Sequence, residues 1–204
     1  MKTFLHVGCG IARKADTTRG FDNDDWRELR LDIDAELQPD IIGSMTDMKA
    51  VPDASCDAVF SSHNIEHLYP HEVPVALAEF RRVLRPTGFV VITCPDLQVV
   101  AEAVAAGRLV EPLYTSPSGP VAAIDIIYGH RPALAAGKLY MAHRCGFTEQ
   151  VLVDTLRNAG FGGVASRRWP DKRDLWAVAS REVIPEADLR HLAAEHFPFH
   201  KRGV

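Results

Sequence analysis

The sequence has no excess of charge of one sign and no long apolar run. Its 204 residues include 23 Lys and Arg against 27 Asp and Glu, a formal net charge of -4. Because no cationic field attracts a polyanion, nucleic acid is disfavoured as the main partner. No stretch approaches the roughly 18 apolar residues of a membrane span, and the start MKTFLHVGCG lacks a signal-peptide core. We therefore expect a cytoplasmic protein with no membrane partner.

Cysteine is also scarce, and its spacing excludes two common kinds of site. Cys9, Cys56, Cys94 and Cys145 lie far apart with no C-x-x-C pair. This spacing is typical neither of a zinc knuckle nor of a thioredoxin-like redox site, so we interpret all four as reduced thiols. The remaining composition is ordinary, with 47% apolar and 25% charged residues. Together with the length, it predicts one globular domain over residues 1–204.

Short β-rich runs alternate with helical or polar stretches along the chain. Strands are expected at residues 4–7, 29–33, 41–42, 58–61 and 89–93, with a further β-rich region after residue 161. Helices are expected over residues 72–84, where apolar residues recur every three or four positions, and over residues 149–158 and 186–195. Such alternation is typical of β-α-β units around a mostly parallel sheet.

Residues 97–145 interrupt this pattern. Their periodicity is weak and they are rich in proline and glycine, which is typical of a lid or a binding loop. Ligands of open α/β sheets bind at the carboxyl ends of the strands, and this segment leaves the fifth expected strand there. We therefore expect a substrate-side lid with His130 and Arg131 pointing inward. Arg131 could equally pair with Asp125 and pin the loop.

A glycine pair follows the first expected strand, in the run Gly8-Cys9-Gly10. Glycine lets the backbone turn sharply and approach a nucleotide-like ligand, although the pair could also be a simple tight turn. The dinucleotide fingerprint G-x-G-x-x-G fails at Arg13, where its third glycine would stand. Asp32 ends the second expected strand and could accept hydrogen bonds from both hydroxyls of a ribose. Asp34 is the alternative acceptor.

The segments LHVGCG, LRLDID, SMTDM, CDAVFSSHNIEHLYPHE and EFRRVLRPTGFVVITCPDL occur in an order that resembles the class I S-adenosylmethionine-dependent methyltransferases. The resemblance covers about residues 3–97, and GFTEQVLVDTLRNAGF resembles the passage before the family's terminal hairpin. It implies a Rossmann-like α/β fold, with a seven-stranded, mostly parallel sheet, helices on both faces and the last strand antiparallel. It also implies S-adenosylmethionine as the cofactor and a small molecule as the methyl acceptor.

The resemblance places the first two turns against the cofactor. Gly8, Cys9 and Gly10 would lie beside its methionine part. Asp32 would hold the ribose, and Ile33 would pack on the adenine.

Two later turns complete the implied pocket. Asp47 would accept a hydrogen bond from the adenine amino group, and the backbone of Met48 would face the ring edge. Ser62 and His63 would line the region where cofactor and substrate meet.

The sequence departs from the family pattern at its first turn. His6 stands where the family usually has an acid, and Ala12 stands where it has a third glycine. Residues 11–27 contain too many Asp, Thr, Gly and Asn for a long regular helix. We therefore expect the amino-acid end of the cofactor to be held differently from the family pattern.

Histidines are the candidates for proton transfer, with Arg131 as the candidate for binding an anionic substrate. Methyl transfer depends mainly on positioning and exclusion of water, so a base is optional. Where the acceptor must lose a proton, His63, His130 or His143 could take it near neutral pH, although each could instead be structural.

A catalytic metal is not expected. His63, His67 and His71 recur every four residues, but Pro70 interrupts any helix there and no H-E-x-x-H pattern is present.

Two other functions fit parts of the sequence. A nicotinamide-dependent oxidoreductase would share the glycine turn and Asp32, but Arg13 and the SMTDM and HNIEHL segments speak against it. A methyltransferase-like binding protein without turnover would fit the irregular stretch after Gly10.

Overall fold

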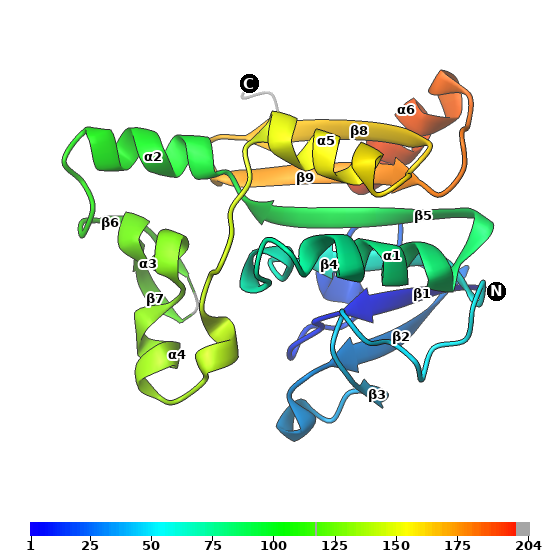
Figure 1. Cartoon of the computed structure of the whole chain (residues 1–204), viewed down its shortest axis with the longest axis horizontal. Helices are drawn as coiled ribbons and strands as arrows, with labels where there is room; N and C mark the ends of the chain where they lie inside the picture. Colours follow the sequence, from blue (N-terminus) through cyan, green and yellow to red (C-terminus); the bar gives the residue numbers. More distant parts are fainter. Residues whose placement is uncertain (117, 199–204) are drawn as a thin grey trace.

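The computed structural model describes residues 1–116 and 118–198. Residues 117 and 199–204, part of the expected domain of residues 1–204, lie outside the described residues. One sheet has the strand order β3-β2-β1-β4-β5-β9-β8, with helices on both faces (Figure 1). Its strands are β1 (Lys2–Val7), β2 (Trp26–Asp32), β3 (Ile41–Ile42), β4 (Cys56–Ser62), β5 (Leu84–Pro95), β8 (Gly163–Trp169) and β9 (Asp174–Ser180).

The strand directions confirm the expected Rossmann-like sheet. Strands β1 to β5 pair in parallel, whereas β9 runs antiparallel to both β5 and β8. Because parallel strands end at the same edge of a sheet, the turns after β1, β2, β4 and β5 lie together. That edge is where a ligand of this fold would bind.

Two helices cover one face of the sheet. They are α1 (Val73–Val83) and α5 (Glu149–Asn158), which lie side by side in front of the strands in Figure 1. Leu77 and Phe80 of α1 are fully buried, as are Leu152 and Leu156 of α5. Burial of each such side chain contributes about 1.5–3 kcal/mol, so these apolar faces hold both helices against the sheet. The apolar spacing that predicted the helices is the sequence pattern of these faces.

The opposite face is packed with aromatic rings. The connection from β1 to β2 has only a single 3-10 turn, η1 (Lys14–Asp16), so no long helix covers the sheet there, as expected. Phe21 from this connection stacks on Phe4 with ring centroids 4.3 Å apart. The C-terminal helix α6 (Glu186–His196) completes the layer, since the His196 ring lies against Phe21 and its Nδ1 is 2.6 Å from the hydroxyl of Thr18.

The segment expected as a lid, residues 97–145, forms a small layer of its own at the carboxyl edge of the sheet, on the left of Figure 1. This insertion contains α2 (Leu97–Ala105), the hairpin of β6 (Pro112–Ser116) and β7 (Gly119–Ala122), and the short helices α3 (Ala123–Tyr128) and α4 (Arg131–Ala135). Its ends meet, because the Leu97 amide donates to the Phe147 carbonyl at 2.9 Å. None of the described helices is long and apolar enough to cross a membrane.

The buried His196 predicts a loss of stability in acid. Burial, helped by the charge of Arg19, lowers its pKa to about 4, below the ordinary value of 6.5. Between these values the unfolded chain binds more protons than the folded chain, so the free energy of unfolding falls as the pH decreases from about 6.5 toward 4, by on the order of 3 kcal/mol.

Urea unfolding of the wild type and of His196→Gln at pH 7 and pH 5 measures this effect. We expect the variant to lose stability at pH 7 but to change less between the two pH values. His191→Gln, on the exposed side of α6, is the control and should keep the wild-type pH dependence. An unchanged pH dependence in His196→Gln would contradict the assignment.

Candidate functional site

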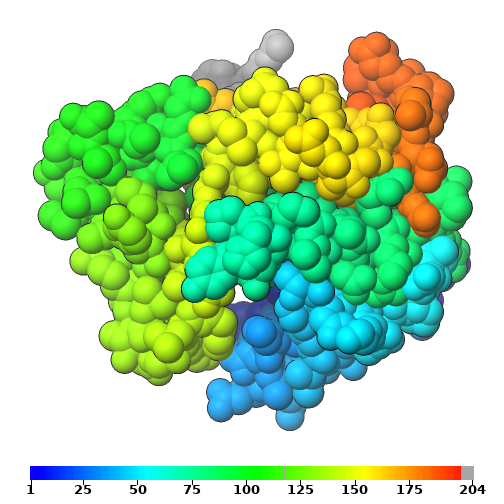
Figure 2. Space-filling model, viewed as in Figure 1, coloured from blue at the N-terminus to red at the C-terminus, as the bar shows by residue number. Residues whose placement is uncertain are grey.

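A cavity of about 620 Å³ opens at the carboxyl edge of the sheet, and we call it the main cavity. In Figure 2 a hollow lies between the insertion (lime), the segment before α1 (teal) and the segment after β2 (blue). The volume suits a nucleotide-sized ligand. Among the expected cofactor residues, its lining includes Gly8, Gly10, Asp32, Ile33, Ser62 and His63.

The glycine turn is held against the turn after β4 by Asn64. Gly8 and Gly10 have left-handed φ angles of +62° and +54°. A Cβ on Gly8 would lie 2.1 Å from the side-chain oxygen of Asn64, so only glycine fits there. The Asn64 amide donates to the carbonyls of Val7 and Ser62 at 3.0 and 2.9 Å. Sequence reasoning missed this residue, whose one signal is a polar side chain two residues after the end of a buried strand.

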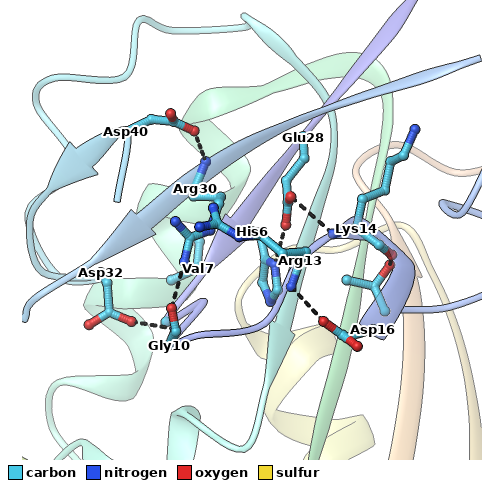
Figure 3. A network of polar contacts seen from close by, with 12 residues as sticks. His6, Val7, Gly10, Arg13, Lys14, Asp16, Glu28, Arg30, Asp32 and Asp40 are labelled. Carbon is cyan, nitrogen blue, oxygen red and sulfur yellow. Dashed lines mark hydrogen bonds and ion pairs between the residues drawn. The ribbon is translucent and has the colours of Figure 1, made fainter. Parts of the chain in front are cut away.

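Asp32 fixes the other side of the glycine turn. Its carboxylate is 7% exposed and accepts hydrogen bonds from the amides of Gly10 at 2.7 Å and Asp34 at 2.9 Å. Arg30, from the same strand, donates to the Gly10 carbonyl at 2.6 Å (Figure 3). Both Asp32 oxygens have further lone pairs, so the carboxylate can still accept from a ligand at the cavity wall.

His6, at the position where the resemblance implies an acid, is a buried partner of Glu28. Its Nδ1 lies 2.7 Å from Glu28 Oε1, and the Lys14 amide donates to Glu28 Oε2 at 3.0 Å (Figure 3). Burial lowers the pKa of His6 despite the neighbouring carboxylate. The pair therefore anchors the start of the irregular β1–β2 connection behind the cavity.

The apolar wall of the main cavity lies after β2 and β3. Ile33 is 57% exposed and lines the cavity, which is an unusual exposure for isoleucine. Residues 43–46 form the neighbouring wall, whereas Asp47 and Met48 are outside the lining. The Asp47 carboxylate pairs with Lys49 at 3.1 Å, and the buried Met48 donates its amide to Glu79 at 2.7 Å. The Met48 amide thus already has a partner.

Cys9 is buried at the glycine turn and is not in the cavity lining. Burial raises the pKa of its thiol to about 11, so the side chain is not a nucleophile at neutral pH. Its contribution to the site is the position of its backbone, whose amide donates to the Leu31 carbonyl at 3.2 Å.

The insertion is tied across the main cavity to Asp34. The Tyr140 hydroxyl donates to Asp34 at 2.7 Å, and Lys138 Nζ lies 3.5 Å from the same oxygen. The hydrogen bond from Tyr140, followed by one from the Glu36 amide, lowers the pKa of Asp34. Asp32 and Asp34 therefore have different partners, since the first holds the glycine turn and the second holds the insertion.

Arg131 does not point into the main cavity, contrary to the lid hypothesis. Its guanidinium makes a bidentate pair with the buried Asp125, at 2.6 and 3.0 Å. This hydrogen bonding outweighs burial and lowers the pKa of Asp125 to about 2. The geometry fits the alternative expectation, that Arg131 pairs with Asp125 and pins the loop, because the pair joins α3 to α4. His130 does line the cavity, and within the described chain its buried Nε2 has no hydrogen-bond partner.

A second cavity of about 240 Å³ adjoins the main one beneath the insertion, and we call it the small cavity. His63, His67 and His130 line both cavities, whereas Glu66 and His143 line only the small one. His71, by contrast, is exposed and stacks on Tyr69. The fold thus separates His71 from His63 and His67, the other two histidines that recur in sequence.

His63 lies between two carboxylates. Its nitrogens are 3.6 Å from Glu66 and 3.4 Å from Asp174. Partial loss of hydration disfavours the imidazolium of this half-exposed side chain, but pairing with Asp174 and Glu66 outweighs it and raises the pKa to about 10. His63 is therefore better suited to holding a charge at the junction of the cavities than to accepting a proton.

His143 differs from His63 because burial lowers its pKa. Its Nδ1 lies 2.6 Å from the Ile126 carbonyl, and its ring packs edge-on to His67 with centroids 4.8 Å apart. The imidazole is therefore neutral near pH 7, with Nε2 available to a ligand.

Comparison with known proteins gives a family match and several similar folds. Residues 5–92 match the family model described as a methyltransferase domain. A solved structure of the 1,6-didemethyltoxoflavin-N1-methyltransferase of Burkholderia thailandensis, with bound 1,6-didemethyltoxoflavin and S-adenosylhomocysteine, is 18% identical. The similarity has a TM-score of 0.56 and covers 88% of this chain and 71% of that one. No curated protein matches the chain.

Two further solved structures share the fold. An S-adenosylmethionine-dependent methyltransferase from Archaeoglobus fulgidus is 14% identical, with a TM-score of 0.54, over 88% of this chain and 86% of that one. A possible histamine N-methyltransferase from Thermotoga maritima is also 14% identical, with a TM-score of 0.51, over 89% and 83% of the two chains. At these identities the likeness concerns the fold.

The close contact at Gly8 predicts a difference between two glycine substitutions. Gly10→Ala should lower the free energy of unfolding by only about 1 kcal/mol, because the residue has a left-handed φ but open space around it. Gly8→Ala must also displace the Asn64 amide, so we expect a loss of about 3 kcal/mol. Urea unfolding curves measure both values. Equal losses would contradict the role given to Asn64.

The Asp125 pair predicts a stability effect for Arg131→Ala. Removing the guanidinium leaves a buried carboxylate with its charge unpaired, so the melting temperature should fall by about 2–6 °C. Arg190→Ala, which removes an exposed pair with Glu186 on α6, is the control and should change it little. An unchanged melting temperature for Arg131→Ala would refute the structural role.

Proposed function

This chain has the fold of the class I S-adenosylmethionine-dependent methyltransferases and its residues 5–92 match their domain, and we propose that it methylates a small molecule with this cofactor. The observation that carries the proposal is the main cavity. It lies at the carboxyl edge of the sheet, and its walls include the glycine turn, the Asp32 carboxylate and the exposed side chain of Ile33. The cofactor supplies an activated methyl group on a sulfonium.

The residues of the main cavity fit S-adenosylmethionine. The turn at Gly8 and Gly10 brings bare backbone to the cavity wall, where a methionine part would need close approach. Asp32 would accept from the ribose hydroxyls, and Ile33 would pack on the adenine. Asp47 lies outside the lining, directly after Thr46, which belongs to it, and remains our candidate for the adenine amine. Among the described residues its half-exposed side chain is held only by Lys49, so it is free to turn toward a ligand.

The acceptor would bind between the insertion and the turn after β4. The small cavity supports a small-molecule acceptor, and it meets the main cavity at His63 and His130. We assign His130 the role of taking a proton from the acceptor, because its Nε2 faces no other partner in the described structure. The Tyr140–Asp34 hydrogen bond would help exclude water from the reacting atoms.

Two alternative functions, an oxidoreductase and a binding protein without turnover, fit the structure to different extents. Neither the strand order nor the family match favours a nicotinamide-dependent oxidoreductase. A binding protein without turnover would have the same cofactor-binding residues as an enzyme. Only the turnover experiment below distinguishes the two.

Titration with S-adenosylhomocysteine tests the cofactor side. We expect one binding site, and Asp32→Ala should weaken binding by about 1.5–3 kcal/mol, roughly 10- to 150-fold in Kd, because the ribose hydroxyls lose their acceptor. Asp34→Ala is the matched control. It should have a smaller effect, since its carboxylate binds the insertion. Isothermal titration calorimetry measures both, and equal losses would refute the assignment of Asp32.

Ligand-binding and turnover experiments test the proposed function as a whole. Absence of heat with millimolar S-adenosylhomocysteine, together with a rise in melting temperature with NADH, would overturn the methyltransferase proposal. Incubation with methyl-labelled S-adenosylmethionine and a metabolite extract tests turnover. Binding without label transfer to any acceptor would instead identify a binding protein.

A further inference from the structure

We propose that Glu66, His67 and His143 bind one divalent metal ion beside the main cavity. Each residue offers one ligand atom, and these atoms lie within 4.8 Å of one another. The first two residues belong to the turn η3 (Ile65–His67) after β4, and the third lies near the end of the insertion. Residue spacing does not reveal this site, because His143 lies far from Glu66 and His67 along the chain.

The Glu66 carboxylate supplies the first argument. The residue is 2% exposed, and neither of its carboxylate oxygens accepts a hydrogen bond within the described part of the chain. Among the described residues its ion-pair partner is His63, whose Nδ1 lies 3.6 Å from Oε1, beyond hydrogen-bond length. A buried carboxylate without donors is costly, and a divalent cation would compensate its charge directly.

The orientation of the two imidazoles supplies the second argument. Nδ1 of His67 lies 3.2 Å from the Ala142 carbonyl, and Nδ1 of His143 lies 2.6 Å from the Ile126 carbonyl. A carbonyl oxygen can only accept, so each Nδ1 carries the proton and each Nε2 has a free lone pair. Imidazoles that bind metals are usually fixed in this way by a backbone carbonyl.

The backbone holds the two ligand segments together without any ion. The amides of Arg144 and Cys145 both donate to the Glu66 carbonyl, at 2.8 and 3.2 Å. The Arg144 guanidinium donates to the His67 carbonyl at 3.0 Å. The three ligand atoms thus come from segments far apart in sequence that main-chain hydrogen bonds fix side by side.

Two imidazoles and one carboxylate form a ligand set that suits zinc or another divalent transition metal. Typical bond lengths of roughly 2.0–2.2 Å require the ligand atoms to move closer together by about 1 Å on binding. A set of three protein ligands leaves a coordination position open, and the small cavity adjoins it. If the proposed methyl transfer holds, that position would orient an oxygen or nitrogen atom of the acceptor near the main cavity.

Metal titration of untagged, chelator-treated protein tests the site. Calorimetry with Zn²⁺ and with Mn²⁺ should give one ion per chain for at least one of them. His143→Ala and Glu66→Gln should each weaken binding at least tenfold. His71→Ala is the matched control, because this histidine is exposed near the same turn, and its affinity should equal that of the wild type. No binding at millimolar metal, or equal affinity in all variants, would overturn the proposal.

A second measurement does not depend on how the variants fold. Co²⁺ added to the wild type should give visible d–d absorption bands that one equivalent of Zn²⁺ removes, and failure of these bands to appear would also count against the site. Titration of S-adenosylhomocysteine into metal-free protein keeps the two proposals apart. Metal binding without cofactor binding would overturn only the methyltransferase function. Cofactor binding without metal binding would overturn only the metal site.

Discussion

The close approach of the Asn64 amide to the backbone of Gly8 sets the geometry on which the candidate site depends. It fixes the turn after β4 against the turn after β1, and Asp32 fixes the same glycine turn from the side of β2. Three consecutive turns at one edge of the sheet are therefore joined by hydrogen bonds within the protein. The walls of the main cavity are therefore held by contacts within the protein, so a bound ligand need not order them itself.

Local signals predicted the fold well, and the site only where its residues follow a strand. The apolar spacing of α1 and the glycine turn reflect contacts within a few residues, so the sequence displays them directly. The contact of Thr18 with His196, 178 residues away, leaves no local pattern, and the same is true of Asn64 beneath Gly8. For Arg131 the partner was near in sequence. Even so, the sequence does not distinguish an Arg131 side chain that points into the cavity from one that pairs with Asp125, whereas the fold does.

Asp32 and Asp34 show how neighbouring carboxylates of one type divide two tasks. The strand ends at Asp32, one of whose oxygens accepts from the Gly10 amide while the other accepts from the Asp34 amide. Asp34 begins the turn η2 (Ala35–Leu37) and reaches outward to Tyr140 of the insertion. A ligand bound along this edge would lie between these contacts. The glycine turn and the insertion are thus linked through two carboxylates at the end of one strand.

The meeting of Leu97 with Phe147 has an evolutionary consequence. The insertion is a loop between two parts of the sheet, and a backbone hydrogen bond joins its two ends. Doubling the length of such a loop costs only about 0.6 kcal/mol in closure entropy. New helices or hairpins can therefore be exchanged at this neck while the strands and the glycine turn stay unchanged, so the ligand specificity of the cavities beneath the insertion can diverge on a constant scaffold.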